Sequence, residues 1–168
     1  MDTTPLRDAY RALLGAAAAL ADSGEPSLPP PAGEWNTEQI LAHVSLVNAV
    51  TITVAASVAA GANTTYDNRL ALDTWTIERT ISRSGGNAGL RERIRLQGDA
   101  LCTLGSGPAL SDAELDTPVP SLLLSNDTLQ VDQPVPLRDL ITGLAEVELP
   151  GHTAQLLALL PDHTGITP

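Results

Sequence analysis

Residues 35–44 read Trp35-Asn36-Thr37-Glu38-Gln39-Ile40-Leu41-Ala42-His43-Val44, and the stretch between Glu38 and Asp67 carries no formal charge. Asn36 with Gln39 three residues later is a capping box preceded by a hydrophobic residue, so a helix is predicted to start here. Beyond it, apolar residues recur every three or four positions, and the neighbouring face is apolar too. The segment therefore predicts a central buried helix, with His43 inside its apolar stripe. A membrane-spanning helix is the alternative for a segment of this length, but its polar interruptions and its reliance on alanine favour burial.

The composition describes one acidic domain covering residues 1–168. Nine arginines and no lysine stand against 20 acidic residues, which gives a net charge of -11. Such a balance, without a basic cluster, argues against nucleic-acid and anionic-membrane partners, because both require cationic side chains. The single Cys102 excludes an internal disulfide framework, and the start of the chain lacks a signal-peptide pattern, so a cytoplasmic protein is expected. Phenylalanine is absent and 43% of residues are hydrophobic, so the core is predicted to be aliphatic.

The remaining chain predicts further helices joined by long connections. Helical periodicity with start and stop signals covers residues 4–22, with Thr4 as the N-cap, then 70–84, 90–104 and a last region that opens at Pro136. The proline-rich stretch from 105 to 136 interrupts the helices, and a short hairpin there would pair 121–124 with 129–131 around Asn126 and Asp127. The predicted fold class is therefore all-α, a four-helix bundle with a long crossover connection before the last helix.

Three ionisable residues occupy positions where the periodicity predicts burial. Glu148 and His152 lie four residues apart and project from one face of the last helix, while His43 lies on a different helix. Two imidazoles and one carboxylate are a ligand set for a catalytic divalent ion with an open coordination position. The alternative is structural: His43 would be a core residue bonded to a carbonyl, and Glu148 would pair with an arginine such as Arg79 or Arg138. Pro150, between the two last-helix ligands, predicts a kink or a restart of the helix.

Two segments carry a resemblance to a known family. Residues 35–44 look like the tryptophan followed by leucine-x-histidine segment of the DinB-like superfamily, which includes the mycothiol-dependent maleylpyruvate isomerases. Near the end, Glu148-Leu149-Pro150-Gly151-His152-Thr153-Ala154-Gln155-Leu156 is similar to the family's last-helix motif, in which a histidine is often followed by x-x-Gln-Leu. The order of elements agrees across most of the chain, but these two segments hold the specific matches.

The resemblance implies a DinB-like four-helix bundle whose metal triad falls on His43, Glu148 and His152, which would also be the catalytic residues. It further implies a divalent metal, zinc or nickel, and a low-molecular-weight thiol such as mycothiol as cosubstrate. The expected activity is isomerisation or S-transfer on a small acidic or specialised metabolite. We expect Arg79 to anchor that substrate, and Trp75 and Gln155 to line its site.

Two other functions are also compatible with the sequence. The bundle could be a metal-independent enzyme or a ligand-binding protein, with His43 as general base and Glu148 orienting it. It could instead be a non-catalytic interaction module that forms a homodimer through its apolar second helix.

Overall fold

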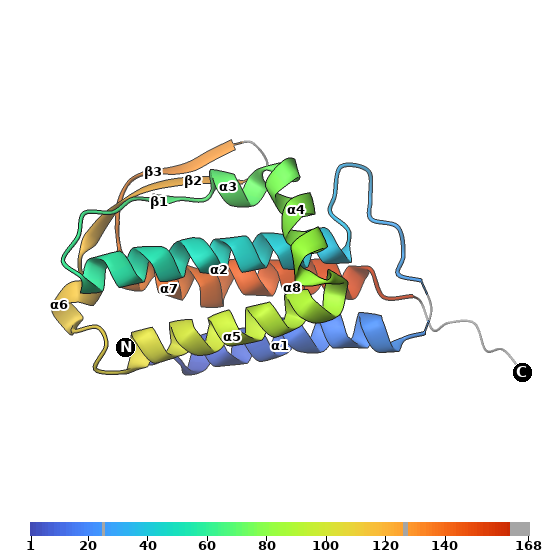
Figure 1. The fold of residues 1–168 in the computed structure, drawn as a ribbon, viewed down its shortest axis with the longest axis horizontal. Helices are drawn as coiled ribbons and strands as arrows, with labels where there is room; N and C mark the ends of the chain where they lie inside the picture. The colour runs from blue at the N-terminus through green and yellow to red at the C-terminus, as the bar shows by residue number, and fades with distance from the viewer. Residues whose placement is uncertain (25, 126–127, 162–168) are drawn as a thin grey trace, which may run out of the picture.

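The structure, a computed structural model, describes residues 1–24, 26–125 and 128–161 and is mostly helical with a small sheet (Figure 1). Its elements in chain order are α1 (Thr4–Asp22), α2 (Thr37–Ala59), β1 (Tyr66–Asp67), α3 (Arg69–Leu72), α4 (Thr74–Ser84), α5 (Gly86–Ser106), α6 (Asp112–Leu115), β2 (Pro118–Ser125), β3 (Thr128–Pro136), α7 (Leu137–Gly143), the π-helical segment η1 (Leu144–Glu148) and α8 (Leu149–Ala158).

The core lies between α1, α2, α5 and the continuous segment α7–η1–α8, which pack side by side along the long axis (Figure 1). Helix α2 is central because it contacts α5, α4, α3 and α8, and its buried residues are distributed around its circumference. By length and composition alone α2 is apolar enough to cross a membrane, yet 67% of the relevant window is buried inside the protein. Helix α2 is therefore the buried core helix that its sequence predicts.

The start of α2 confirms the predicted capping box. The Asn36 side chain accepts from the Gln39 N–H, and the Gln39 side chain accepts from the Asn36 N–H, both at 3.0 Å. Replacing Asn36 with alanine is expected to destabilise the protein by about 1 kcal/mol, because a buried core helix loses its cap. Urea denaturation of Asn36→Ala, with the exposed loop variant Asn63→Ala as control, checks this. Equal stability of the two variants would contradict it.

Two helix boundaries differ from the prediction. The N-cap residue of α1 is Thr3 rather than Thr4, and the Thr3 side chain makes no capping hydrogen bond. The Thr4 N–H donates to the Asp2 carboxylate instead. The predicted helix over 70–84 is divided into α3 and α4 at Asp73, whose side chain caps α4 by accepting from the Thr76 N–H. An aspartate side chain can take a backbone N–H away from the helical hydrogen-bond pattern in this manner. The spacing of apolar residues gives no sign of such a break.

A three-stranded sheet of order β1-β2-β3 makes the all-α prediction incomplete. The predicted hairpin is confirmed and is longer than expected, since β2 and β3 pair from Pro118 with Pro136 to Ser125 with Thr128. Its predicted turn at Asn126 and Asp127 lies outside the described residues. β1 adds a short parallel pairing to β2. The hairpin lies along α2 and α7 in the part of the chain predicted as a crossover (Figure 1).

The last helical region passes Pro150 without a break. η1 ends at Glu148, and α8 begins at Leu149 with Pro150 in its first turn, where the missing N–H removes no necessary helical hydrogen bond. The Leu149 N–H bonds to the Leu144 carbonyl, five residues back, as in a π turn. The predicted kink or restart at Pro150 is therefore replaced by a π segment within a continuous helical region, a feature often found at functional sites.

Candidate metal centre

His43 is held in one orientation by the short helix α3. The ring is only 4% exposed, and its Nδ1 lies 2.8 Å from the Ala71 carbonyl oxygen. Because a carbonyl can only accept, Nδ1 carries a proton and donates it. Nε2 therefore points the other way, toward the last helical region, and presents a lone pair whenever the ring is neutral.

His152 is fixed in a similar way by Gln155, one turn further along α8. Its Nδ1 lies 2.7 Å from the Gln155 side-chain oxygen, and the Gln155 amide nitrogen donates to the Glu34 carboxylate at 3.4 Å. Since a carboxylate only accepts, the Gln155 NH₂ group faces Glu34 and the amide oxygen faces His152. Nδ1 of His152 therefore donates too, and its Nε2 is the free ring nitrogen.

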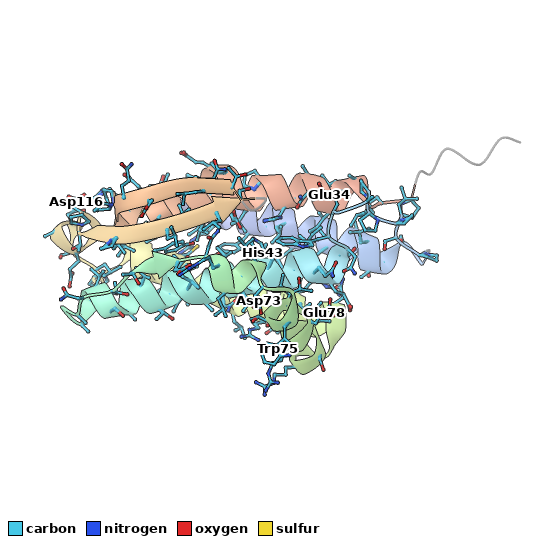
Figure 2. All side chains as sticks on the ribbon, turned by 90° about the horizontal axis from the view of Figure 1, so that it is seen from above. Glu34, His43, Asp73, Trp75, Glu78 and Asp116 are labelled. Atoms are coloured by element: carbon cyan, nitrogen blue, oxygen red, sulfur yellow. The ribbon has the colours of Figure 1, made fainter. Side chains whose placement is uncertain are left out.

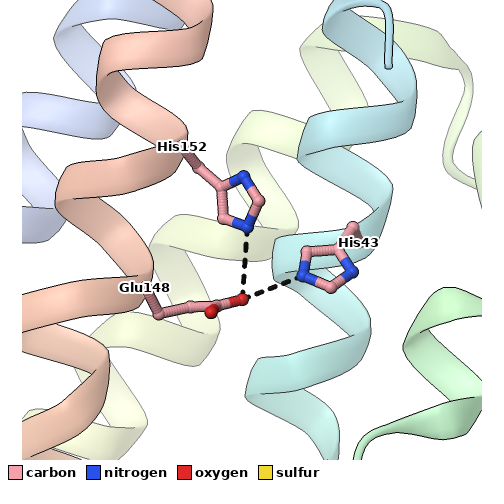
Figure 3. A group of neighbouring side chains, drawn as sticks. All are labelled: His43, Glu148 and His152. Atoms are coloured by element: carbon pink, nitrogen blue, oxygen red, sulfur yellow. Dashed lines mark hydrogen bonds and ion pairs between the residues drawn. The ribbon is translucent and has the colours of Figure 1, made fainter. Parts of the chain in front are cut away.

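Both free ring nitrogens meet one carboxylate oxygen. Oε1 of Glu148 lies 2.8 Å from Nε2 of His43 and 3.2 Å from Nε2 of His152, and Figure 3 shows the three side chains converging from α2 and from the η1–α8 segment. The candidate ligand atoms all lie within 4.8 Å of one another. Zinc ligands at ~2.0–2.1 Å in tetrahedral geometry are about 3.4 Å apart, so the contact between His43 and Glu148 must open by roughly half an ångström, and the most widely separated ligand atoms must move closer together.

Lone pairs on three converging atoms require positive charge between them. With neutral imidazoles and an ionised Glu148, three electron-rich atoms would face each other at hydrogen-bond distance, which is repulsive. Two protons, one on each ring, relieve this and give a net charge of +1. One divalent ion does the same with the same net charge. The site therefore fits a divalent cation, and both histidines have the outer hydrogen bond to an acceptor that is typical of metal-ligating histidine.

Electrostatics in the metal-free protein favour the charged forms of Glu148 and His152. Burial opposes ionisation of Glu148, but hydrogen bonds from His152 and His43 outweigh it and hold the Glu148 pKa well below its ordinary value. Burial likewise opposes protonation of His152, but its hydrogen bond to Glu148 prevails and raises the His152 pKa above its ordinary value.

These shifts predict how the stability of the metal-free protein depends on pH. The lowered Glu148 pKa stabilises the fold above the ordinary value of 4.5, and this contribution is lost as pH falls through the lower folded value. The raised His152 pKa stabilises the fold below the ordinary value of 6.5, and this contribution is lost as pH rises through the higher folded value. These two groups together therefore stabilise the metal-free protein most between the two ordinary values.

Thermal unfolding in the presence of a chelator, repeated from acid to alkaline pH, measures this pH dependence of stability. The melting temperature is expected to decline above the ordinary histidine pKa in the wild type, and less steeply in His152→Gln. Added zinc is expected to reverse the trend, because its ligands must be deprotonated and binding strengthens as pH rises. If the melting temperatures of the metal-free wild type and His152→Gln fell equally at alkaline pH, the raised pKa of His152 would be wrong.

Trp35 covers the cluster from the loop before α2. Its ring centroid lies 4.6 Å from that of His43 and 6.2 Å from that of His152. An indole face stabilises nearby positive charge, whether on imidazolium or on metal ligands. Beside it lies a pocket of about 340 Å³, named the outer pocket, which reaches His43, Glu148 and His152 and is also lined by Gly33, Glu34, Trp35, Asn68, Leu72, Leu124, Ser125 and Gln155.

The structure brings together four of the six predicted site residues. His43, Glu148, His152 and Gln155 line the outer pocket, whereas Trp75 and Arg79 do not. Trp75 is 66% exposed on α4, and Figure 2 shows it directed away from His43. The Arg79 guanidinium lies over the Trp75 ring, 4.9 Å from its centroid. The alternative pairing of Glu148 with an arginine is wrong, because Glu148 pairs with the two histidines and Arg138 pairs with Asp116 and Asp112.

Several pocket residues are not predicted by the sequence. The sequence predicts Trp35 only as the hydrophobic residue before a capping box, and its position eight residues before His43 is the signal that could have placed it at the site. Asn68 gives no signal: its side chain donates to the Leu124 carbonyl at 2.8 Å and accepts from the Leu124 N–H at 2.9 Å. It thereby attaches the end of β2 to the rim of the pocket.

No protein-family model, no curated protein and no solved structure matches the chain.

Proposed function

We propose that this protein is a metal-dependent enzyme that uses a low-molecular-weight thiol, as an isomerase or S-transferase. The observation that carries the proposal is the orientation of the two histidines: each donates Nδ1–H to an acceptor, and both free ring nitrogens meet the same oxygen of Glu148. His43, Glu148 and His152 would hold one divalent ion, zinc or nickel. When bound, such an ion lowers the pKa of a thiol that reaches its open position.

The remaining residues prepare the site for small molecules. Ala71 and Gln155 fix the tautomers of the histidines, so the ligand atoms are oriented before any ion arrives. Trp35 shields one side of both rings from water, while the outer pocket gives access to Glu148. The net charge of -11 attracts cations to the protein as a whole.

We also propose that the fold is a DinB-like four-helix bundle. In support, four long helical segments pack side by side, and the ligands come from the second and the last of them, as the resemblance implies. The hairpin occupies the connection before the last segment and is, in this proposal, an addition to the bundle.

Binding of cobalt and a thiol tests the proposal. The protein loaded with Co²⁺ is expected to develop a sulfur-to-cobalt charge-transfer absorption when a low-molecular-weight thiol is added, because a three-ligand site leaves a position for it. The variant Glu148→Gln should lose the absorption and Glu146→Gln, an exposed neighbour in η1, should retain it. A protein that binds cobalt tightly but shows no thiol absorption would contradict thiol use.

A second candidate function is metal-free acid–base catalysis at the same residues. One observation favours it: hydrogen bonds alone connect the side chains of His43, Glu148 and His152. It predicts that a chelator leaves activity unchanged and that His43→Ala abolishes it in metal-free protein.

A further inference from the structure

A second pocket lies beneath the hairpin, on the other side of Glu148. It encloses about 280 Å³ between α2, the hairpin and the α7–η1 segment, and its lining is mostly apolar. Its apolar walls include Val47, Leu123, Val131, Val135, Leu140 and Leu144. We name it the hairpin pocket.

The hairpin pocket adjoins the candidate metal centre. Glu148 and Asn68 line both this pocket and the outer pocket, so the Glu148 carboxylate stands where the two meet. A molecule whose apolar part fills the hairpin pocket would bring its polar end to Glu148, and the outer pocket would stay open to a second molecule.

The charges around the hairpin pocket disfavour an anionic occupant. Asp139 and Glu148 are its ionisable acidic residues, and no arginine is among the described residues that line either pocket. Tyr66 adds a hydroxyl, and burial raises the Tyr66 pKa to about 12, so the group stays neutral. A ligand carboxylate buried inside the hairpin pocket would therefore meet no arginine there, which is costly.

A helical glycine with free space around its Cα lines the hairpin pocket. Gly143 lines it at the end of α7, and a Cβ built there would meet no atom within 4 Å. Glycine in a helix costs up to about 1 kcal/mol relative to alanine, so nothing in local helix stability favours it. A larger side chain at this position would project into free space rather than displace the core.

We propose that the hairpin pocket binds an uncharged, apolar group of the substrate, alkyl or aromatic, and so brings the polar end of that substrate to Glu148. The inference rests on the proposed function for the role of Glu148 and specifies its substrate class. It replaces the small acidic metabolite expected from the sequence with a neutral, largely apolar electrophile that meets the thiol arriving through the outer pocket.

Binding of 1-hexanol and hexanoate to the full chain tests this without metal or activity. The two probes share a chain length and differ in charge, and a chelator removes carboxylate–metal bonds from the comparison. Methyl NMR shifts of Val131, Val135 and Leu140 report the occupied pocket. Hexanol is expected to bind at least about tenfold more tightly than hexanoate, because a carboxylate buried in the pocket would meet Asp139 and Glu148 but no arginine. Gly143→Leu should lose the hexanol response, and Gly15→Leu, an exposed α1 glycine that also has free space, should keep it.

The outcomes separate this inference from the proposed function. Equal binding of both probes, or hexanol binding unchanged in Gly143→Leu, would overturn the inference even if the protein holds metal and thiol. Failure to bind cobalt and thiol would overturn the proposed function, whereas selective hexanol binding would still establish an apolar ligand pocket beside Glu148.

Discussion

Replacing His43 with alanine is expected to lower zinc affinity at least about 100-fold, since loss of an outer-shell partner alone costs 10–100-fold and His43 is a direct ligand in this account. Competition with a chelating dye measures the dissociation constant. The variant loses one of two nitrogens and also the ring that is anchored to Ala71. Glu148 would then face a single histidine, His152, at 3.2 Å.

The matched control is His163→Ala, which removes a histidine close to the C-terminal end of the sequence. It is expected to leave zinc affinity unchanged, because three candidate ligands already converge among the described residues. Thermal unfolding with a chelator shows whether His43→Ala remains folded. Equal zinc affinity of the wild type and a folded His43→Ala would refute the ligand assignment.

Truncation of Leu149 is expected to produce a large loss of stability, about 2–5 kcal/mol for Leu149→Ala. The side chain is fully buried at the junction of η1 and α8, where both segments pack against α1. Removing it leaves a cavity at the residue that directly follows Glu148 in the chain. Urea denaturation, analysed as a two-state transition, gives the free energy of unfolding.

Leu157→Ala on the same helix is the control. Leu157 is 50% exposed, so its truncation should change the free energy of unfolding by less than about 0.5 kcal/mol. If the two variants were equally stable, the packing of α8 against α1 would be wrong, and with it the position of His152.

Much of the helical architecture could be predicted from the sequence because its signals are local. The capping box at Asn36 and Gln39 defines the start of α2, and the glycines after Ser84 define the end of α4, where Gly85 adopts the left-handed conformation at φ 76°. The extent of the sheet could not be predicted, because β1 is two residues long and pairs with a strand more than fifty positions away. Such a pairing depends on tertiary contacts rather than on residue pattern.

The candidate site was predictable where periodicity places polar groups on buried faces. His43, Glu148 and His152 interrupt apolar stripes, and such interruptions indicate polar groups that face the interior. Trp75 and Arg79 lie on α4, whose outer face is exposed, and no local signal distinguishes the exposed side of that helix from the rim of a pocket. The π segment could not be predicted either, because Pro150 indicates that the helix is disturbed but not which form the disturbance takes.

Zinc uptake followed by X-ray absorption at the zinc edge shows directly whether His43, Glu148 and His152 bind one ion. We expect one zinc per chain, bound by two imidazole nitrogens and at least one oxygen at ~2.0–2.1 Å, with no protein sulfur. We also expect the imidazole signal to be reduced in His152→Ala. A protein that takes up no stoichiometric zinc, or that binds it through Cys102, would contradict the account.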